Sequence, residues 1–239
     1  YGATAAPWTM YRDSIKKVVI GDGITSIGNY AFYLCPNLKE VAFAENGVLK
    51  EIGEGAFGYC GLETITLPAT VEVLGKNALY YNDSLKTVDF EADSKLTTIG
   101  DYAFRNCTSL ESVYIPDGVT KIGSVILYQA NADAVLSVAD ETYAETYAVK
   151  AGYKYVTREY VAKPLYTGTC GDTATWTLYD TGVLEIAGTG DMADYTYHKY
   201  GETAAPWTMY RNSIKKVVIG EGIESIGNYA FYSCPNLKE

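Results

Sequence analysis

The side chains able to bind a metal or act in catalysis are few in this 239-residue chain. It holds five cysteines and one histidine, His198. The two nearest cysteines, Cys35 and Cys60, stand 25 positions apart (60 − 35), whereas zinc sites generally need closer pairs such as Cys-x-x-Cys. A catalytic triad needs a base beside its nucleophile, and His198 lies in a stretch without a clear structural pattern. The sequence therefore predicts no metal ion, no cofactor and no catalytic residue.

Four of the five cysteines recur at one position of a repeated pattern, and the fifth, Cys170, stands outside it. The four are Cys35, Cys60, Cys107 and Cys234. This placement predicts small thiols packed inward in an apolar core. Side chains stacked in parallel on neighbouring repeats rarely reach disulfide geometry, so we expect these thiols to be free.

A nucleotide-binding signature is present only superficially. Gly188–Ala193 (GTGDMA) follows a predicted strand and matches the dinucleotide fingerprint G-x-G-x-x-A. That fingerprint requires a helix immediately afterwards within a βαβ unit. Residues 195–206 are instead rich in tyrosine and end at Pro-Trp, so a turn is the better interpretation.

Composition narrows the class of protein further. With 19 Lys+Arg against 29 Asp+Glu, the formal net charge is −10, and an acidic protein repels the phosphate backbone of nucleic acids. No apolar run approaches the ~20 residues that cross a bilayer, and no signal-peptide pattern is present, so a signal peptide would lie outside this sequence. Hydrophobic residues make up 48% of the chain, enough to form the core of one or two domains.

An internal repeat decides the predicted fold. A unit of 23 to 25 residues reads Leu-x-x-Val-x-Ile, a turn, and then Ile-Gly-x-x-Ala-Phe-x-x-Cys. One unit cannot bury its apolar face alone, but stacked units share a continuous core. The pattern therefore predicts an α/β repeat solenoid with short parallel strands. The five units, called repeats 1 to 5, are Ile15–Asn37, Leu38–Gly61, Leu62–Ser84, Leu85–Ser109 and Leu110–Asp133.

Each unit has two further predicted features. The glycine after isoleucine is expected to permit a tight bend, and Ala-Phe before cysteine is expected to form one short helical turn that packs inward. Repeats 3 and 5 depart from the pattern, which predicts local repacking there. The departures are Leu79 and Leu127 in place of phenylalanine, and Asn82 and Ala130 in place of cysteine.

Alternating residues predict strands at 18–20, 41–43, 65–67, 88–90 and 113–115, with the first and third residues inward. Two columns of side chains then point outward, and solenoids commonly bind ligands along such extended surfaces. A merely solvated sheet face is the competing interpretation. One column holds Val19, Ala42, Thr66, Asp89 and Tyr114, and the other Lys17, Glu40, Thr64, Thr87 and Ser112. The candidate ligand-binding residues are Val19, Ala42, Thr64, Thr66, Thr87, Asp89, Ser112 and Tyr114.

The repeat resembles the BspA-like leucine-rich repeats, which are marked by Ile-Gly-x-x-Ala-Phe-x-x-Cys-x-x-Leu. The resemblance covers about residues 15–133 and 214–239. It implies a leucine-rich-repeat solenoid of stacked short parallel strands in a bacterial cell-surface or secreted protein. It also implies adhesion to matrix proteins or other cells as the function.

The rest of the chain contains a cap and a different module. Val135–Val138 is a predicted last strand, residues 142–151 a predicted short helix ended by Gly152, and Tyr153–Val156 a returning strand. Alternating segments around Asp180-Thr181-Gly182 predict a β-hairpin. Trp8, Trp176 and Trp207 are expected to pack in caps, since two of them repeat in Ala-Pro-Trp. The predicted organisation is 1–14 as the end of a cap module, 15–133 as five repeats, 134–156 as a C-terminal cap, 157–169 as a linker, 170–213 as a hairpin module and 214–239 as the first repeat of a next unit.

A long duplication underlies this organisation. Residues 1–40 and 200–239 align at an offset of 199 (200 − 1) and are identical at 35 of 40 positions. The differing pairs are Ala3/Glu202, Asp13/Asn212, Asp22/Glu221, Thr25/Glu224 and Leu34/Ser233. The chain is therefore expected to be cut from a tandem array or built to overlap itself. Its exposed ends would favour self-association.

The predicted function is non-catalytic protein binding at a host or microbial surface, without membrane insertion. Counting carboxylates does not decide whether a glycosidase pair exists, but such a pair needs a cleft that a regular solenoid does not offer. Two alternatives stay open. One is a carbohydrate-binding accessory region of a larger secreted enzyme, and the other is a passive spacer that projects another domain.

Overall fold

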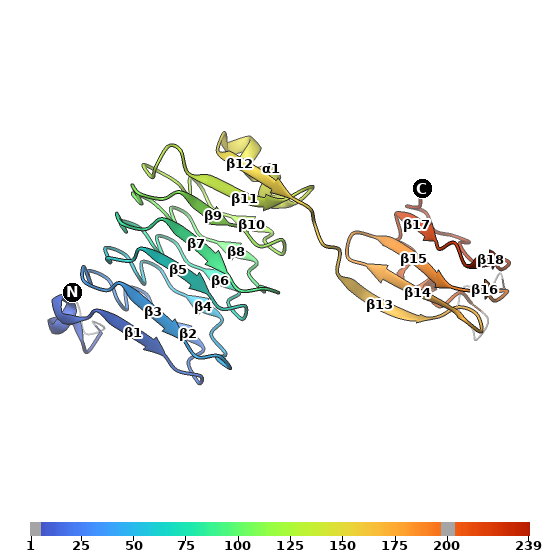
Figure 1. Cartoon of the computed structure of the whole chain (residues 1–239), viewed down its shortest axis with the longest axis horizontal. Coiled ribbons are helices and arrows are strands. Elements are labelled where there is room, and N and C mark those ends of the chain that lie inside the picture. Colours follow the sequence, from blue (N-terminus) through green and yellow to red (C-terminus); the bar gives the residue numbers. More distant parts are fainter. Residues whose placement is uncertain (1–5, 197–203) are drawn as a thin grey trace. The chain divides into compact units, whose positions relative to one another are not determined.

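The computed structural model describes residues 6–196 and 204–239, which form two compact units (Figure 1). Unit 1 comprises residues 1–160 and unit 2 residues 161–239. His198 lies outside the described residues. Each unit has its own hydrophobic core.

Unit 1 is a solenoid in which each repeat contributes a longer and a shorter strand, as expected for a repeat protein whose units share one core. The longer strands are β1 (Lys17–Ile20), β3 (Glu40–Phe43), β5 (Thr64–Leu67), β7 (Thr87–Phe90) and β9 (Ser112–Tyr114). The shorter strands contain the isoleucine or leucine of the Ile-Gly pair and were not foreseen. They are β2 (Ser26–Ile27), β4 (Glu51–Ile52), β6 (Val73–Leu74), β8 (Thr98–Ile99) and β10 (Lys121–Ile122).

The strands pair in parallel and in the predicted register. The shorter strands form one five-stranded sheet, and β5, β7 and β9 continue into the cap as a second. Among the described strands, β1 and β3 form a separate pair that is not hydrogen-bonded to β5, so the predicted single stack divides in two. The inward residues of β5, β7 and β9 are fully buried, whereas Val18, Val41 and Phe43 are half-buried.

The predicted short helical turn at Ala-Phe is wrong. Every repeat instead makes two successive turns, each containing a residue in the left-handed region with φ between 47° and 59°. Backbone hydrogen bonds to the next repeat hold these turns, for example Phe57 N–H to Ala78 O at 2.9 Å and Leu79 N–H to Ala103 O at 2.9 Å. Bonds between neighbours thus stabilise a conformation that most residues avoid. The first turns place Tyr30, Gly55, Asn77, Tyr102 and Val125 in this region, and the second turns Leu34, Tyr59, Tyr81, Asn106 and Gln129.

The glycine of the Ile-Gly pair also has a different role from the one predicted. It does not adopt a positive φ, so a tight bend is not the reason for glycine. A Cβ at Gly53 would lie 2.8 Å from Asn29 N, and one at Gly100 would lie 2.4 Å from Lys76 N. The glycine is needed because neighbouring repeats approach too closely for a side chain.

The cysteine position joins neighbouring repeats through its thiol. Cys60 Sγ donates to Phe32 O at 3.2 Å, and Cys107 Sγ donates to Leu79 O at 3.3 Å. Asn82, which replaces cysteine in repeat 3, donates from Nδ2 to Phe57 O at 2.8 Å. The replacement therefore keeps the inter-repeat hydrogen bond. The four cysteines at the repeat position are free, as predicted, and so is Cys170. All are buried except Cys234, which is half-buried.

The end of the solenoid contains the predicted strands and helix. Strand β11 (Val135–Ala139) pairs with β9, helix α1 (Tyr143–Ala151) follows, and β12 (Lys154–Arg158) pairs with β11. Thr142 Oγ1 accepts from Glu145 N–H, and the Glu145 carboxylate accepts from Glu141 N–H, as in a capping box. Gly152 ends the helix at φ 72°, as predicted for a left-handed cap.

Unit 2 contains the predicted hairpin, β14 (Ala174–Tyr179) and β15 (Val183–Gly188), joined through Gly182 at φ 85°. The predicted linker at 157–169 is wrong in part, because β13 (Pro164–Thr169) pairs antiparallel with β14. On its other side β15 pairs in parallel with β17 (Lys216–Ile219), and β16 (Gly190–Asp191) pairs with β18 (Ile223–Ser225). The module of β13 to β16 thus lies directly on the repeat at 214–239, called repeat 6.

Candidate functional site

The outward strand face predicted from the sequence is present, but its members differ in exposure. Thr64, Thr87 and Ser112 stand in register on adjacent strands. Thr66 and Asp89 are exposed, and the side chain of Val19 is 68% exposed. At the start of the column, Lys17 and Glu40 form an exposed ion pair, while Ala42 is half-buried. These residues lie on two sheets, one of β1 and β3 and one that contains β5, β7 and β9.

Tyr114 is the member that the cap covers. The Arg158 guanidinium carbon lies 4.2 Å from the centre of the Tyr114 ring. The same guanidinium donates to Ile115 O at 2.6 Å and forms an ion pair with Asp117. Tyr114 therefore packs against the cap and is not a free aromatic contact for a ligand.

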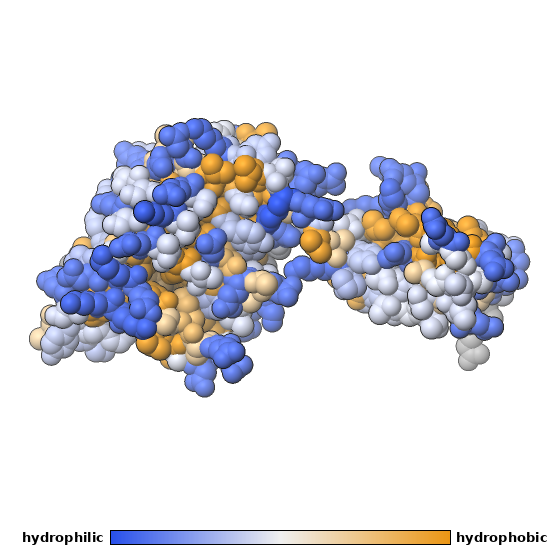
Figure 2. Space-filling model, viewed as in Figure 1, coloured by the Kyte–Doolittle hydropathy of each residue, from blue (hydrophilic) through white to orange (hydrophobic). Residues whose placement is uncertain are grey.

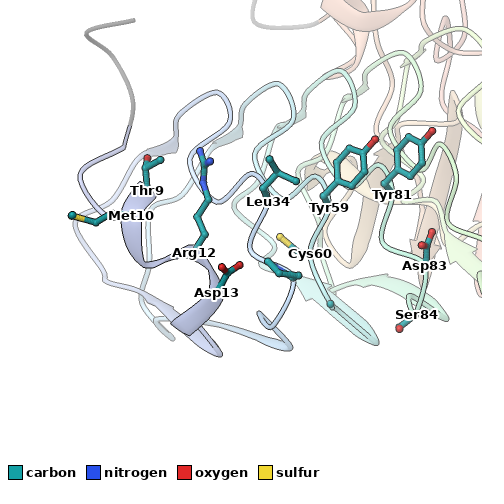
Figure 3. A pocket seen from close by; sticks show the side chains of 12 residues that line it. Thr9, Met10, Arg12, Asp13, Leu34, Tyr59, Cys60, Tyr81, Asp83 and Ser84 are labelled. Atoms are coloured by element: carbon teal, nitrogen blue, oxygen red, sulfur yellow. The ribbon is translucent and has the colours of Figure 1, made fainter. Parts of the chain in front are cut away.

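A hollow lies in unit 1 at the turns that precede each cysteine position. It has a volume of about 570 Å³. On one side stands the 3-10 helix η1 (Thr9–Ser14), and on the other stand the second turns of repeats 1 to 3 (Figure 3). Its lining residues are Thr9, Met10, Arg12, Asp13, Leu34, Pro36, Tyr59, Cys60, Gly61, Tyr81, Asp83 and Ser84. We call it the tyrosine groove.

Two tyrosines form the aromatic wall of the tyrosine groove. Tyr59 and Tyr81 occupy the left-handed position of successive repeats, so their side chains leave the backbone in the same direction. Their ring centres are 4.3 Å apart at an interplanar angle of 8°. Figure 3 shows the rings side by side with both hydroxyls pointing the same way. The repeat thus presents a stacked pair with a polar rim.

More aromatic rings support this wall from behind. Tyr80 meets Tyr59 edge-on with ring centres 5.2 Å apart and stacks on Tyr33 with centres 6.1 Å apart. Gly58 makes room for this packing, since a Cβ there would lie 2.1 Å from the Tyr80 ring. On the far side the Arg105 guanidinium lies 5.9 Å from the centre of the Tyr81 ring. These contacts hold the wall rigid before a ligand arrives.

Two groups of the tyrosine groove, the Tyr59 hydroxyl and the Cys60 thiol, have pKa values above their ordinary ones. Burial raises the pKa of Tyr59, and the neighbouring Tyr81 raises it further. Burial likewise raises the pKa of the Cys60 thiol to about 12, so the thiol is not a nucleophile there. Within the described residues no three His, Cys, Asp or Glu side chains gather as a metal site would require. The chemistry is suited to binding through apolar contact and hydrogen bonds.

The tyrosine groove was missed by the sequence reasoning, which placed the candidate site on the strand face. A signal was available, because Tyr59 and Tyr81 fall at the same repeat position. The assumption of a helical turn obscured it. The left-handed position of Tyr59 and Tyr81 places both side chains in the lining of the groove.

The geometry defines a class of protein first: a leucine-rich-repeat solenoid whose turns and strands are held by contacts between repeats. The chain belongs to the family of the BspA type leucine-rich repeat region, whose model matches in six copies over residues 9–133 and 201–239. A comparison with curated proteins found no match. Among the described residues, no helix has the length and apolar character needed to span a membrane.

Two solved structures of bacterial proteins are similar to this chain. The pneumococcal vaccine antigen PcpA is 24% identical with a TM-score of 0.50, over 94% of this chain and 50% of that one. A leucine-rich cell-surface protein from Faecalibacterium prausnitzii A2-165 is 20% identical with a TM-score of 0.44, over 100% of this chain and 65% of that one. This chain therefore spans about half to two thirds of the length of these relatives.

Proposed function

We propose that this chain is a non-catalytic, protein-binding part of a bacterial cell-surface or secreted protein. Membership of the BspA-type family and the similarity to the pneumococcal vaccine antigen PcpA support this assignment. The single observation that carries the binding role is the tyrosine groove, a hollow of about 570 Å³ with a preformed aromatic wall. Aromatic side chains supply large contact areas at protein interfaces for little loss of conformational entropy.

A protein segment suits the tyrosine groove better than a sugar does. Rings that bind sugars lie with an open face against the pyranose, but the facing sides of Tyr59 and Tyr81 cover each other. Each ring therefore has at most one face left for a sugar, and the pair also offers a ligand its ring edges and two hydroxyls. Arg12, Asp13 and Asp83 add charges of both signs nearby, which suits the mixed polar groups of a polypeptide. We therefore propose a protein ligand.

The outward strand face is the competing surface on the same unit. Thr64, Thr66, Thr87, Asp89 and Ser112 remain proposed ligand contacts there, and binding would then follow the strands. The two surfaces belong to different parts of each repeat, so single substitutions can separate them.

The test is binding of the whole chain to a panel of purified extracellular-matrix proteins, beside a glycan array. Replacing Tyr81 with alanine removes half of the aromatic wall, and we expect at least about a tenfold loss of affinity for any bound matrix protein, since interface energy concentrates in a few aromatic residues. Tyr143→Ala is the matched control, because Tyr143 is 46% exposed, lies on helix α1 and does not line the groove. It should leave binding unchanged.

Other outcomes are equally informative. If Thr66→Lys abolishes binding while Tyr81→Ala does not, the strand face is the site and the tyrosine groove is not. Binding on the glycan array alone would overturn the proposed protein ligand in favour of a carbohydrate-binding accessory region. No binding to the matrix proteins or to the glycan array would favour a passive spacer.

A further inference from the structure

A second hollow, apolar and unoccupied by any described residue, lies at the edge of repeat 1 that faces away from repeat 2. We call this edge the front edge. The hollow has a volume of about 390 Å³, and apolar surface covers this part of unit 1 (Figure 2). Its ten lining residues are Trp8, Val18, Val19, Ile20, Ile24, Ser26, Ile27, Gly28, Ala31 and Phe32.

The same surface exists once more in the chain, and there it is covered in part: Trp207, Gly227 and Ala230 are buried, whereas Val218, Ser225 and Ile226 stay exposed. All ten lining residues recur identically in repeat 6 and the segment before it, since none of the five sequence differences falls among them. In repeat 6, strand β17 pairs with β15 over four residues. Ser225 Oγ bonds to Asp191 Oδ1, and Tyr195 N–H donates to Asn228 O at 2.9 Å. Residues 164–195, which are called the hairpin module from here on, therefore complement this surface.

The front edge of repeat 1 is already in the conformation that the hairpin module contacts. Trp8 stacks on Phe32 with ring centres 5.4 Å apart, and its Nε1 donates to Ala31 O at 2.8 Å. In repeat 6 the equivalent ring distance is 5.6 Å and the hydrogen bond is again 2.8 Å. The difference lies in what covers the indole: Trp207 also meets Trp176 and Tyr195 edge-on and is 1% exposed, whereas Trp8 is 37% exposed.

The contact between the hairpin module and repeat 6 is tightest at a glycine. A Cβ at Gly227 would lie 1.7 Å from Ala193 O of the hairpin module, so no side chain fits there. Its counterpart Gly28 has nothing within 4 Å of the same position and an ordinary backbone conformation. No described residue of unit 1 lies close enough to require glycine at this position, whereas the docked hairpin would.

We propose that the front edge of repeat 1 binds the hairpin module of a second copy of this chain, in the geometry that joins β15 to β17. The contact is an exchange, because each hairpin module already lies on its own repeat 6. By this exchange the hairpin module leaves repeat 6, where Ile226 is 56% exposed, and binds repeat 1. Repeat 1 is supported on its other side, because β1 pairs with β3. Such head-to-tail contacts make closed dimers or open chains.

Light scattering of the whole chain over a wide concentration range tests the proposal, and we expect mass to rise with concentration. Gly28→Ala should abolish association without changing the stability of unit 1. Gly227→Ala should have the opposite effect and strengthen association by at least about tenfold, because it frees the hairpin module for exchange. The double variant should be monomeric.

The double variant also separates exchange from nonspecific aggregation. If loosening repeat 6 merely exposed apolar surface, Gly227→Ala would aggregate whether or not Gly28 is replaced. A second probe is a cysteine pair, Ser26→Cys with Asp191→Cys, which should give disulfide-linked dimers on oxidation. A wild-type chain that stays monomeric at all concentrations, or a Gly28→Ala variant that associates like the wild type, would overturn the proposal.

Discussion

Repeat 1 and repeat 6 have nearly the same sequence and nearly the same backbone, yet they bury opposite sides. Trp8 is 37% exposed where Trp207 is 1% exposed. Ile27 is 4% exposed where Ile226 is 56% exposed. The tryptophan faces the front edge, which the hairpin module covers only in repeat 6. The isoleucine is buried by the following repeat, where Ile27 stands beside Ile52, and the structure holds such a neighbour only for repeat 1.

Whether an apolar side chain of a repeat is buried thus depends on which element packs against that repeat. A repeat supplies the same apolar groups on both sides, and each group becomes core only when another element lies against it. The local hydrogen bonds do not depend on this. The indole bond to the alanine carbonyl is 2.8 Å in both copies. Conformation is therefore local to the repeat, whereas stability is shared between repeats.

The largest effect should separate the two tryptophans. Trp207→Ala removes a fully buried ring and should destabilise unit 2 by about 3–5 kcal/mol. Trp8→Ala should cost unit 1 about half of that, because part of the ring is in water already. Urea unfolding followed by hydrogen exchange, with each unit resolved by mass spectrometry, measures both losses. Equal losses would mean that the hairpin module adds nothing to the tryptophan of repeat 6.

The isoleucines should show the reverse order with a smaller effect. Ile27→Ala leaves a cavity against repeat 2 and should cost about 2–4 kcal/mol. Ile226→Ala, at a side chain already more than half exposed, should cost less than about 1 kcal/mol. The same unfolding experiment applies. A loss at Ile226 as large as that at Ile27 would contradict the assignment of an open side to repeat 6.

The thiols of repeats 1 and 6 should differ in their reactivity. Cys35 is buried and Cys234 is half-buried, so a thiol reagent should label Cys234 first under native conditions and all five cysteines after denaturation. Mass spectrometry of labelled peptides identifies the order. Early labelling of Cys35 would show that repeat 1 opens readily.

These thiols also predict a decline of stability at alkaline pH. Burial raises the pKa of Cys60 and Cys107 from 9.0 to about 12. A group whose pKa is raised on folding stabilises the fold fully below its unfolded pKa, and this contribution is lost as pH rises through the folded value. Stability of unit 1 should therefore fall between about pH 9 and pH 12. Cys60→Ala with Cys107→Ala should make this decline shallower.

The smallest effect is expected where the two copies agree. Lys17 pairs with Glu40 at 2.5 Å, and Lys216 pairs with Glu239 at 2.9 Å, both on exposed surface. Exposed ion pairs contribute little because water and salt screen them. Lys17→Ala and Lys216→Ala should leave the unfolding midpoints of both units unchanged at low and high salt. A salt-dependent shift in one copy alone would reveal a wider charge network around that repeat.

The sequence predicted the repeat, the inward residues, the free thiols and the capping helix because each rests on a local pattern. Alternation in Ile65–Leu67 needs only the geometry of a strand, and Gly152 needs only a helix to end. The roles of other residues could not be found this way. Gly53 and Gly100 are required by the backbone of the preceding repeat, which lies more than 20 positions away in the sequence.

The binding surface, too, was predictable from the sequence only in part. That this chain is an acidic repeat solenoid with inward-facing cysteines was determined by its sequence alone, since periodicity fixes which residues share a face. Only the tertiary structure decided that Arg158 covers Tyr114 and that Tyr59 and Tyr81 stack as a wall. Those contacts join residues from different repeats, and their closeness depends on how tightly the repeats stack and on the left-handed turns that stacking stabilises.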